Sequence, residues 1–318
     1  MLILPRLGKH RGRISSALST LSKTWSSAFH NSHLSDHADL HPRDMTGSEH
    51  SKLTSAIARQ PLLADASIVA VHQITPSVKR LRLHVQDRSF SFQPGQWIDF
   101  HAPGVPIIGG YSIVSPPSQL TSLRTFDIAV KQSSHSPAHW VHTQAVQGVQ
   151  VKVQVGGEFV LTAADLGRPL LFVAGGIGIT PLMSMISYYV EKVPSLLKAG
   201  MQPSATLLYS AGLGEELAFR AELNDLQESS EGRLAVKYFV TQEVDKDAPQ
   251  EHTRLDLEYR RLRPEDISVC LQQAGHSCAA EKGPLMFLCG PPQMCGHVVE
   301  YAQSLGMPKG CVRTEKWW

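Results

Sequence analysis

The chain has 318 residues, enough for two domains with separate cores, and a formal net charge of +2 at pH 7. This balance gives no electrostatic reason to expect a nucleic acid or an anionic membrane surface as a partner. The five cysteines lie near the C-terminus without the paired short spacings of a disulfide framework, a zinc site or an iron–sulfur cluster, which indicates a reducing compartment and no metal.

Residues 1–50 differ from the rest in composition. Basic residues from Arg6 to Lys23 precede the first acidic residue, Asp36, and serine and threonine are abundant between them. This pattern is typical of a mitochondrial transit peptide and predicts a mitochondrial protein, with a plain disordered tail as the alternative. The leading "MLILP" is too short an apolar core for a secretory signal.

The segment 60–163 shows short runs in which apolar and polar residues alternate, broken by proline and glycine. Such runs predict an antiparallel β-sheet or small barrel. The predicted strands are "ASIVAVHQI", "VKRLRLHV", "QWIDFHAP", "YSIVSPP", "TFDIAVKQ" and "VQVKVQVGGEF".

The segment 167–318 has a different rhythm, in which continuous apolar runs alternate with helical patterns. This order predicts a parallel α/β sheet. The expected strands are "RPLLFVAGG", "ATLLYSA", "LAVKYFVT" and "PLMFLCG", and the expected helices are "TPLMSMISYYVEKV", "EELAFRAELNDLQE" and "MCGHVVEYAQSLG", the last ended by Gly306. The stretch between Thr241 and Gly283 gives no clear pattern.

A glycine-rich turn, "AGGIGITP", follows the first of these strands. We expect the strand to end at Ala174 and a helix to begin near Pro181, with Thr180 as its N-cap. Glycines let main-chain amides approach a ligand, and a helix N-terminus favours negative charge, so the turn suits a pyrophosphate. Tight packing alone is the alternative, because Pro181 replaces the third glycine of the usual dinucleotide fingerprint.

The same stretch does not predict a membrane span, since glycines and a proline interrupt its centre. A second loop, "CGPPQM" from Cys289 to Met294, follows another buried strand. Ligands of parallel sheets bind beyond the carboxyl ends of the strands, so we expect both loops to line one crevice.

Together, "GGIGITP", "CGPPQM" and "YSIVSPP" make the chain resemble the ferredoxin–NADP reductase superfamily over roughly residues 66–318. The resemblance implies an antiparallel β-barrel of the flavin-reductase type followed by a parallel α/β nucleotide-binding domain. It also implies NAD and FAD as cofactors.

The resemblance further implies roles for individual residues. The turn would wrap the pyrophosphate of a nicotinamide dinucleotide with main-chain amides, namely those of Gly175, Gly176, Ile177, Gly178, Ile179 and Thr180. In the second loop, Cys289 would sit beside the nicotinamide ring, with Gly290 and Pro291 as further cofactor contacts. Tyr111 would stack on a flavin ring, Ser112 would hydrogen-bond near the reactive nitrogen of the flavin, and Trp318 would cover the ring. Cys289 and Ser112 are the expected catalytic residues, with a buried hydrophobic cysteine and a strand-core tyrosine as the simpler readings of Cys289 and Tyr111.

Two departures from the family pattern concern the flavin phosphate. Gly109 stands where relatives carry an arginine, and Ala138 stands where they carry a serine, although Lys131 or His135 could compensate. Nicotinamide binding is therefore better supported than flavin binding. Glu215 and Glu216 near the ribose favour NAD over NADP, although Arg254 could still reach that region.

The sequence thus predicts an NADH-dependent flavoprotein oxidoreductase that passes hydride from nicotinamide through a flavin to an unknown electron acceptor. The main alternative is a non-enzymatic nicotinamide-binding sensor or assembly protein that has lost flavin. A structural module without any nucleotide is the third reading.

Overall fold

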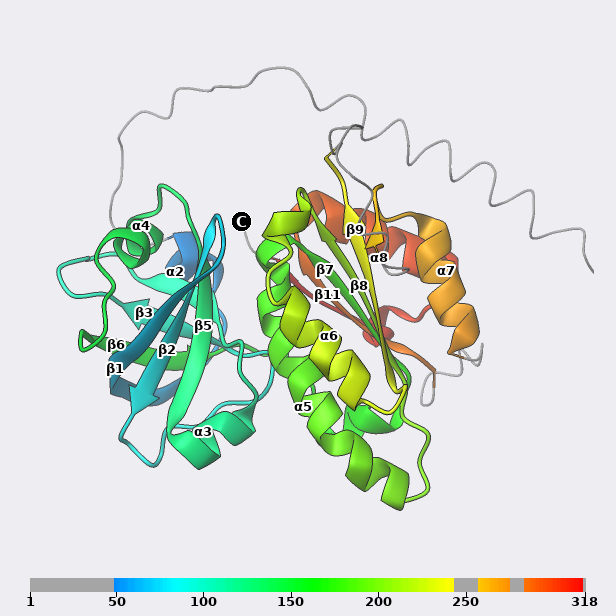
Figure 1. Ribbon diagram of the computed structural model, residues 1–318, viewed down its shortest axis with the longest axis horizontal. Coiled ribbons are helices and arrows are strands. Elements are labelled where there is room, and N and C mark those ends of the chain that lie inside the picture. The colour runs from blue at the N-terminus through cyan, green and yellow to red at the C-terminus, as the bar shows by residue number, and fades with distance from the viewer. Residues whose placement is uncertain (1–48, 243–256, 275–282, 317–318) are drawn as a thin grey trace, which may run out of the picture. The chain divides into compact units, whose positions relative to one another are not determined.

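The computed structural model describes residues 49–242, 257–274 and 283–316. Most of the expected transit segment, together with Arg254, Cys278 and Trp318, therefore lies outside the described residues. The described chain forms two β-sheets, an antiparallel one followed by a parallel one flanked by helices (Figure 1).

The first sheet has six antiparallel strands in the order β4-β3-β6-β1-β2-β5. An isolated antiparallel bridge between Ile113 and Ile128 connects the two ends of this order, so the sheet is a nearly closed barrel. The strands are β1 (Arg59–Thr75), β2 (Val78–Val85), β3 (Trp97–His101), β4 (Gly109–Ser112), β5 (Thr125–Lys131) and β6 (Gln150–Gly156).

Period-two alternation explains why these segments form strands. In β2, Leu81, Leu83 and Val85 are fully buried and the residues between them are partly exposed. The buried side chains meet inside the barrel with those of the other strands. Three short helices lie beside the strands, α2 (Glu49–Leu53), α3 (Pro117–Leu123) and α4 (Ser136–Thr143).

The second sheet has six parallel strands in the order β10-β9-β8-β7-β11-β12. They are β7 (Leu170–Gly175), β8 (Ala205–Ala211), β9 (Leu234–Val240), β10 (Leu257–Glu258), β11 (Leu285–Gly290) and β12 (Val312–Lys316). Every residue of β7 and β11 is buried, as expected for a sheet covered on both faces.

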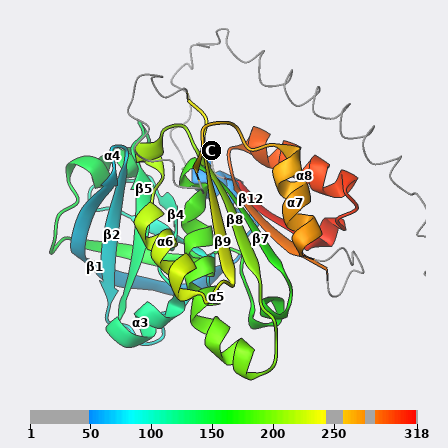
Figure 2. The same ribbon diagram turned by 45° about the vertical axis from the view of Figure 1, so that its right-hand side comes forward.

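Helices cover the two faces of the parallel sheet (Figure 2). On one face lie α5 (Ile179–Lys198) and α6 (Arg220–Ser229), and on the other lie α7 (Pro264–Gln273) and α8 (Pro292–Ser304). The expected fold, a barrel followed by a parallel α/β sheet, is confirmed. In the described residues no helix is both long and apolar enough to cross a membrane.

The strand order changes direction between β7 and β11. From β7 the chain proceeds outward through β8 and β9 on one side, whereas β11 pairs with β7 on the other side. After β7 the chain enters α5 on one face of the sheet, and after β11 it enters α8 on the other face. Such a switch point is where α/β sheets bind ligands.

One predicted N-cap and one predicted helix start are wrong. The helix α5 begins at Ile179, because the 3-10 turn Gly176–Gly178 runs directly into it, so Thr180 lies within the first turn and is not the N-cap. The Thr180 hydroxyl donates to the carbonyl of Ile177 at 2.9 Å instead. Pro181 is in the first turn, as expected.

The helix α6 begins at Arg220 and not at Glu215. The preceding residue, Phe219, is buried and has a left-handed backbone with φ of 63°, so the helix cannot extend through it. The predicted end of the last helix, α8, is confirmed. The amide of Gly306 donates a hydrogen bond to the carbonyl of Gln303, and Gly306 has a left-handed backbone with φ of 87°.

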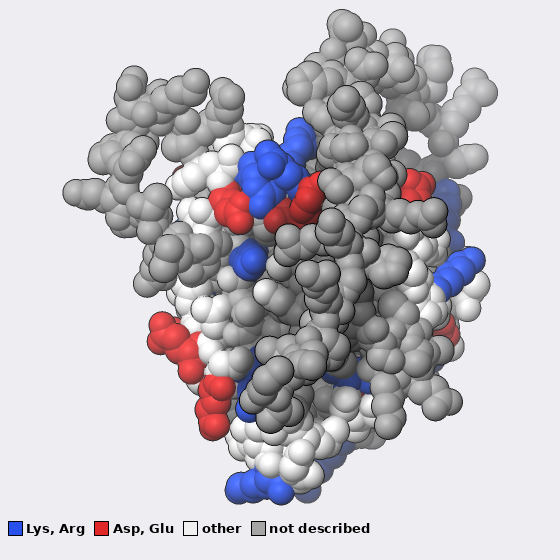
Figure 3. Space-filling view, turned by 90° about the vertical axis from the view of Figure 1, so that its right-hand side faces the viewer, with Lys and Arg blue, Asp and Glu red and all other residues white. Residues whose placement is uncertain are grey.

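The unassigned stretch 241–283 contributes β10 and α7 within its described part. Figure 3 shows described basic and acidic side chains lying next to one another in small groups on this side of the molecule. Among the described residues, the guanidinium of Arg260 pairs with both Glu258 and Asp266.

Candidate functional site: two cavities at the switch point

The glycine turn after β7 packs directly on the loop after β11. A β-carbon built at Gly175 would lie 2.7 Å from both Met294 Sδ and Pro291 Cδ, and one built at Gly290 would lie 3.0 Å from Gly175 Cα. A side chain at either position would separate the two loops. The two loops are therefore in contact, but residues 289–294, including the predicted cofactor contacts Gly290 and Pro291, line neither of the two cavities described below, so these cavities do not show the expected common crevice.

Gly176 differs from Gly175 and Gly178 in that no other described part of the chain packs against its β-carbon position. It has φ of 53°, a left-handed conformation that favours glycine, and its β-carbon position is open, with no atom within 4 Å. The turn therefore exposes main chain at the N-terminus of α5, which carries a partial positive charge. The arrangement suits an anionic ligand.

A cavity of about 250 Å³ opens beside this exposed main chain. Gly176 and Ile177 line it together with the end of β8, with Gln242 after β9 and with Glu216. The Glu216 carboxylate accepts hydrogen bonds from the hydroxyls of Thr75, at 2.9 Å, and Ser77, at 2.6 Å. The barrel turn between β1 and β2 therefore holds this carboxylate in place in the smaller cavity.

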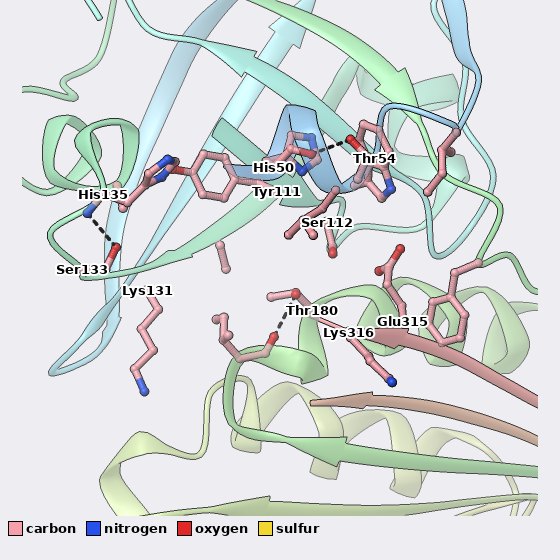
Figure 4. A pocket seen from close by; sticks show the side chains of 18 of the residues that line it. His50, Thr54, Tyr111, Ser112, Lys131, Ser133, His135, Thr180, Glu315 and Lys316 are labelled. Carbon is pink, nitrogen blue, oxygen red and sulfur yellow. Dashed lines mark hydrogen bonds between the residues drawn. The ribbon is translucent and has the colours of Figure 1, made fainter. Parts of the chain in front are cut away.

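A larger cavity of about 660 Å³ lies next to the first (Figure 4). Lys131 and Ile177 line both cavities, so the two are adjacent at these residues. The walls come from the barrel, the segment before β1, the start of α5 and β12. Its lining includes Tyr111, Ser112, Thr180 and Lys316, which surround the space in Figure 4.

Tyr111 and Ser112, two residues that line the larger cavity, each carry a buried hydroxyl without a hydrogen-bond partner. These atoms are the Oη of Tyr111 and the Oγ of Ser112. Leaving a buried polar group unpaired costs about 1–3 kcal/mol, so such groups are commonly found where a ligand completes them. Burial also raises the pKa of Tyr111, which keeps its phenol protonated.

Gly109 is explained by the ring of Tyr111. A β-carbon at position 109 would lie 2.7 Å from Tyr111 Cε2 and 2.9 Å from Pro137 Cβ. The tyrosine ring and the first turn of α4 therefore fill the place where an arginine side chain would start. Ala138, the second departure, is buried in the same turn and lines the larger cavity.

The cations near the larger cavity differ in how they are engaged. Arg313 makes a bidentate pair with Asp165, at 2.8 and 2.9 Å, and lies over the ring of Phe287, so its role is structural. Lys131 is exposed, and within the described part of the chain no carboxylate pairs with it. Lys131 is thus available to an anion at the junction of the two cavities.

Cys289 is more deeply placed than the sequence led us to expect. Its side chain is fully buried and belongs to the core of the parallel sheet, and it lines neither cavity. Burial raises the pKa of its thiol well above the usual value, and Glu315 and Cys295 add to this shift. Gly290 is buried beside it, whereas Pro291 is exposed. Trp318 lies outside the described residues, so its predicted role is untouched by the structure.

Sequence reasoning missed the contribution of the segment before β1. His50, Leu53, Thr54 and Ile57 line the larger cavity, although position 50 falls in the segment assigned to a transit peptide or disordered tail. No local pattern marks these residues as part of a site, because their partners lie on β3 and β4. No group of three or more potential metal ligands occurs among the described residues.

Comparison with known proteins agrees with this geometry. The profile of the family described as "Oxidoreductase NAD-binding domain" matches residues 172–300, which include the glycine turn and the loop after β11. Ferredoxin–NADP reductase B of Sorangium cellulosum is 29% identical over 260 residues, covering 80% of this chain and 97% of that protein.

A ferredoxin NADP+ reductase from Neisseria gonorrhoeae, crystallised with bound FAD and NADP, shares the fold with a TM-score of 0.62 at 18% identity, covering 81% of this chain and all of that one. The predicted resemblance to the ferredoxin–NADP reductase superfamily is confirmed. Oxidoreductase NAD-binding domain-containing protein 1 of Xenopus laevis is 33% identical over 275 residues, covering 85% of this chain and 84% of the frog protein. On this identity and coverage, the chain belongs to the family of oxidoreductase NAD-binding domain-containing protein 1.

Proposed function

We propose that the chain is an NADH-dependent oxidoreductase in which hydride passes from nicotinamide through a flavin to an electron acceptor. The single observation that carries this proposal is the meeting of two features at one switch point. Exposed main chain at Gly176 supports a pyrophosphate site, and two unpaired hydroxyls in the wall of the adjoining cavity support a site for a second polar ligand.

The smaller cavity is the proposed site of the dinucleotide. Main-chain amides from Gly176 onward and the N-terminus of α5 would hold the pyrophosphate, and Lys131 would add a positive charge. Glu216 would face the ribose. A 2′-phosphate there would be repelled by the fixed carboxylate, which supports NAD as the preferred dinucleotide over NADP.

The larger cavity is the proposed site of the flavin, and its residues fit the ring end of that group. The unpaired hydroxyls of Tyr111 and Ser112 would hydrogen-bond to polar edges of the ring. At the phosphate end, the first turn of α4 and Lys131 would have to replace the arginine that relatives carry at the position of Gly109. A bound flavin supplies a ring that accepts two electrons with a hydride and releases them to a further acceptor.

The residues around the junction of the cavities would orient the reactants and exclude water. The bound dinucleotide and flavin would supply the hydride chemistry, and the residues of this chain would hold the two rings in contact. Thr180, buried with its hydroxyl held on Ile177, would shape the contact surface between the two ring sites. Cys289 would support this surface from the core behind the glycine turn, and Trp318 would cover the flavin ring from the C-terminal end.

Cofactor content tests this proposal. The full-length chain is purified without denaturant, its bound cofactors are identified by mass spectrometry, and flavin and NADH are each titrated into the stripped protein. We expect tight NADH binding, flavin uptake and NADH oxidation that depends on flavin. If the chain binds NADH but stays colourless after flavin reconstitution, the proposed oxidoreductase function is contradicted.

That contrary result supports a second function, a nicotinamide sensor or assembly protein that has lost flavin. The filling of the position next to Gly109 by the Tyr111 ring is the observation that favours it. A chain that binds neither ligand excludes both functions.

We also propose a mitochondrial location, supported by the basic, serine-rich composition of residues 1–50. A fluorescent protein fused behind residues 1–50 tests it. Delivery of the fusion to mitochondria, with loss of delivery when the arginines between residues 6 and 13 are replaced, is the expected result.

A further inference from the structure

Residues 50–57, here called the N-terminal wall, precede the barrel and yet form part of the larger cavity. His50, Leu53, Thr54 and Ile57 all line it. Figure 4 shows His50 and Thr54 on the same side of the cavity as Ser112. Leu53 is 50% exposed, which is high for a leucine. Its exposed surface and the half-buried side chain of Ile57 make this part of the cavity apolar.

The N-terminal wall is fixed to strand β3 by a network centred on Asp99. His50 Nε2 lies 2.7 Å from Asp99 Oδ1, and Arg59 Nε donates to Asp99 Oδ2 at 3.0 Å. The guanidinium of Arg59 also donates to the Thr54 hydroxyl at 2.6 Å and to the Ile57 carbonyl at 2.8 Å. Burial alone would raise the pKa of Asp99, but the hydrogen bonds from His50 and Arg59 outweigh it and hold the pKa below its usual value.

The imidazole ring of His50 is wedged against β4 where the strand has no side chain. Asp99 pairs with Gly110, and Trp97 pairs with Ser112, so these four residues share one face of the β3–β4 pair. A β-carbon at position 110 would overlap the imidazole ring and lie 2.5 Å from its Cγ. The ring also meets the edge of Trp97, with ring centroids 4.8 Å apart. Only glycine at 110 leaves room for it.

We propose that the N-terminal wall is part of the flavin-ring site and that His50 is a positioning residue for Ser112. By filling the space over Gly110 and bonding to Asp99, His50 fixes the end of β4 and with it the position of Ser112 in the cavity wall. The wall adds apolar surface for a flat aromatic ring on the same side. This inference rests on the proposed function, because it concerns how the larger cavity takes a flavin.

The experiment compares two substitutions at the contact between the His50 ring and Gly110, here called the wedge variants. Each changes one side of this contact. Gly110→Ala adds a methyl group that displaces the His50 ring, and His50→Ala removes the ring and its hydrogen bond. Gly296→Ala is the matched control, since its β-carbon position in α8 is open and its backbone suits alanine. Full-length proteins are titrated separately with riboflavin and with NADH, and amide hydrogen exchange is followed at residues 109–112 and 170–175.

We expect both wedge variants to bind riboflavin about tenfold more weakly, as for loss of a well-placed hydrogen bond and its packing. NADH affinity should stay within about twofold. Exchange should accelerate at residues 109–112 and stay unchanged at residues 170–175. A purely space-filling His50 predicts lower stability without this split between the two ligands. Gly296→Ala should change none of these quantities.

Riboflavin binding that is unchanged in both wedge variants, in protein that is folded and binds NADH, overturns this inference and leaves the proposed function intact. Failure of the unaltered chain to bind any flavin overturns the proposed function. It also overturns the proposed role of the N-terminal wall in flavin binding. Unchanged exchange at residues 109–112 overturns the positioning role of His50 in either case.

Discussion

The backbone of Gly178 lies directly against that of Cys289. A β-carbon at position 178 would lie 2.5 Å from the carbonyl carbon of Cys289 and 2.7 Å from the amide nitrogen of Gly290. This contact joins the turn after β7 to the end of β11. The rigid main chain on both sides leaves no flexible group that could move aside for a side chain.

Gly178→Ala is therefore expected to push the two loops apart. Overpacking of this kind costs about 1–3 kcal/mol of stability. Because the displaced turn includes the proposed pyrophosphate site, NADH affinity should fall by about tenfold or more. Isothermal titration and thermal unfolding measure the two effects, with Gly296→Ala as the neutral control. Wild-type NADH affinity in a folded Gly178→Ala protein would mean that the dinucleotide binds elsewhere.

Glu216→Gln is expected to relax the choice between NADH and NADPH. The amide keeps an acceptor for the hydroxyls of Thr75 and Ser77 and removes the charge that would repel a 2′-phosphate. NADPH should bind about tenfold more tightly, an effect of about 1.4 kcal/mol, whereas NADH should change by less than about threefold.

Glu215→Gln is the matched control for that change. Glu215 is the exposed neighbour and does not line the smaller cavity. A preference for NADPH that shifts equally in both variants would assign the effect to long-range charge and not to the carboxylate in the cavity.

Tyr111→Phe should stabilise the ligand-free protein while weakening flavin binding. The buried Tyr111 hydroxyl has no partner, so its removal should raise the free energy of unfolding by about 1 kcal/mol. The same hydroxyl is a proposed flavin contact, and its loss should lower flavin affinity several-fold. Chemical denaturation and flavin fluorescence titration measure the two quantities.

Tyr189→Phe is the control, for which we expect the opposite change in the free energy of unfolding. The hydroxyl of Tyr189 donates to the Arg233 carbonyl at 2.9 Å, so this variant should lose stability. Destabilisation by Tyr111→Phe would show that its hydroxyl is satisfied in the free protein.

Acid should destabilise the fold through buried carboxylates. Asp127 is fully buried between Arg80 and Arg82, and these arginines outweigh the effect of burial and lower its pKa. The pKa values of Asp99 and Asp165 are lowered in the same way. Their stabilisation is complete above the unfolded pKa of about 3.9 and is lost as the pH falls through the lower folded values.

Thermal unfolding measured from pH 6 down to pH 2 should therefore show a steep loss below about pH 4. Asp127→Asn should be less stable at neutral pH by about 1.5–3 kcal/mol, because the half-buried Arg80 and the more exposed Arg82 lose their charged hydrogen-bond partner, and should depend less on acid pH. Equal acid sensitivity in the variant and the unaltered protein would exclude Asp127 as a source of the effect.

Cys289 should resist alkylation in the native protein. Its thiol is fully buried with a raised pKa, and thiol reagents react with the exposed thiolate. Mass spectrometry after iodoacetamide treatment at pH 8 should find Cys289 unmodified until the protein is denatured. Rapid native modification would mean that the loop after β11 opens and exposes the thiol.

The sequence by itself determined the two sheets and the two loops. Alternating apolar residues, as in β2, and continuous apolar runs, as in β7, are local patterns, so each strand type could be read from neighbouring residues. The glycine turn and the loop after β11 were also local signals, and parallel topology then placed them at one edge of the sheet. Errors fell at helix starts, where a left-handed Phe219 and a continuous 3-10 turn depend on packing.

The tertiary structure alone decided what surrounds the site. Nothing near Glu216 in the sequence indicates that Thr75 and Ser77 hold its carboxylate, and nothing near His50 indicates that Gly110 leaves space for its ring. Likewise, the burial of Cys289 and the filling of the space beside Gly109 follow from residues that are distant in the chain. Local pattern fixes the type of each element, because backbone geometry repeats along the chain. Contacts between distant residues depend on how the elements pack, and only the folded chain brings them together.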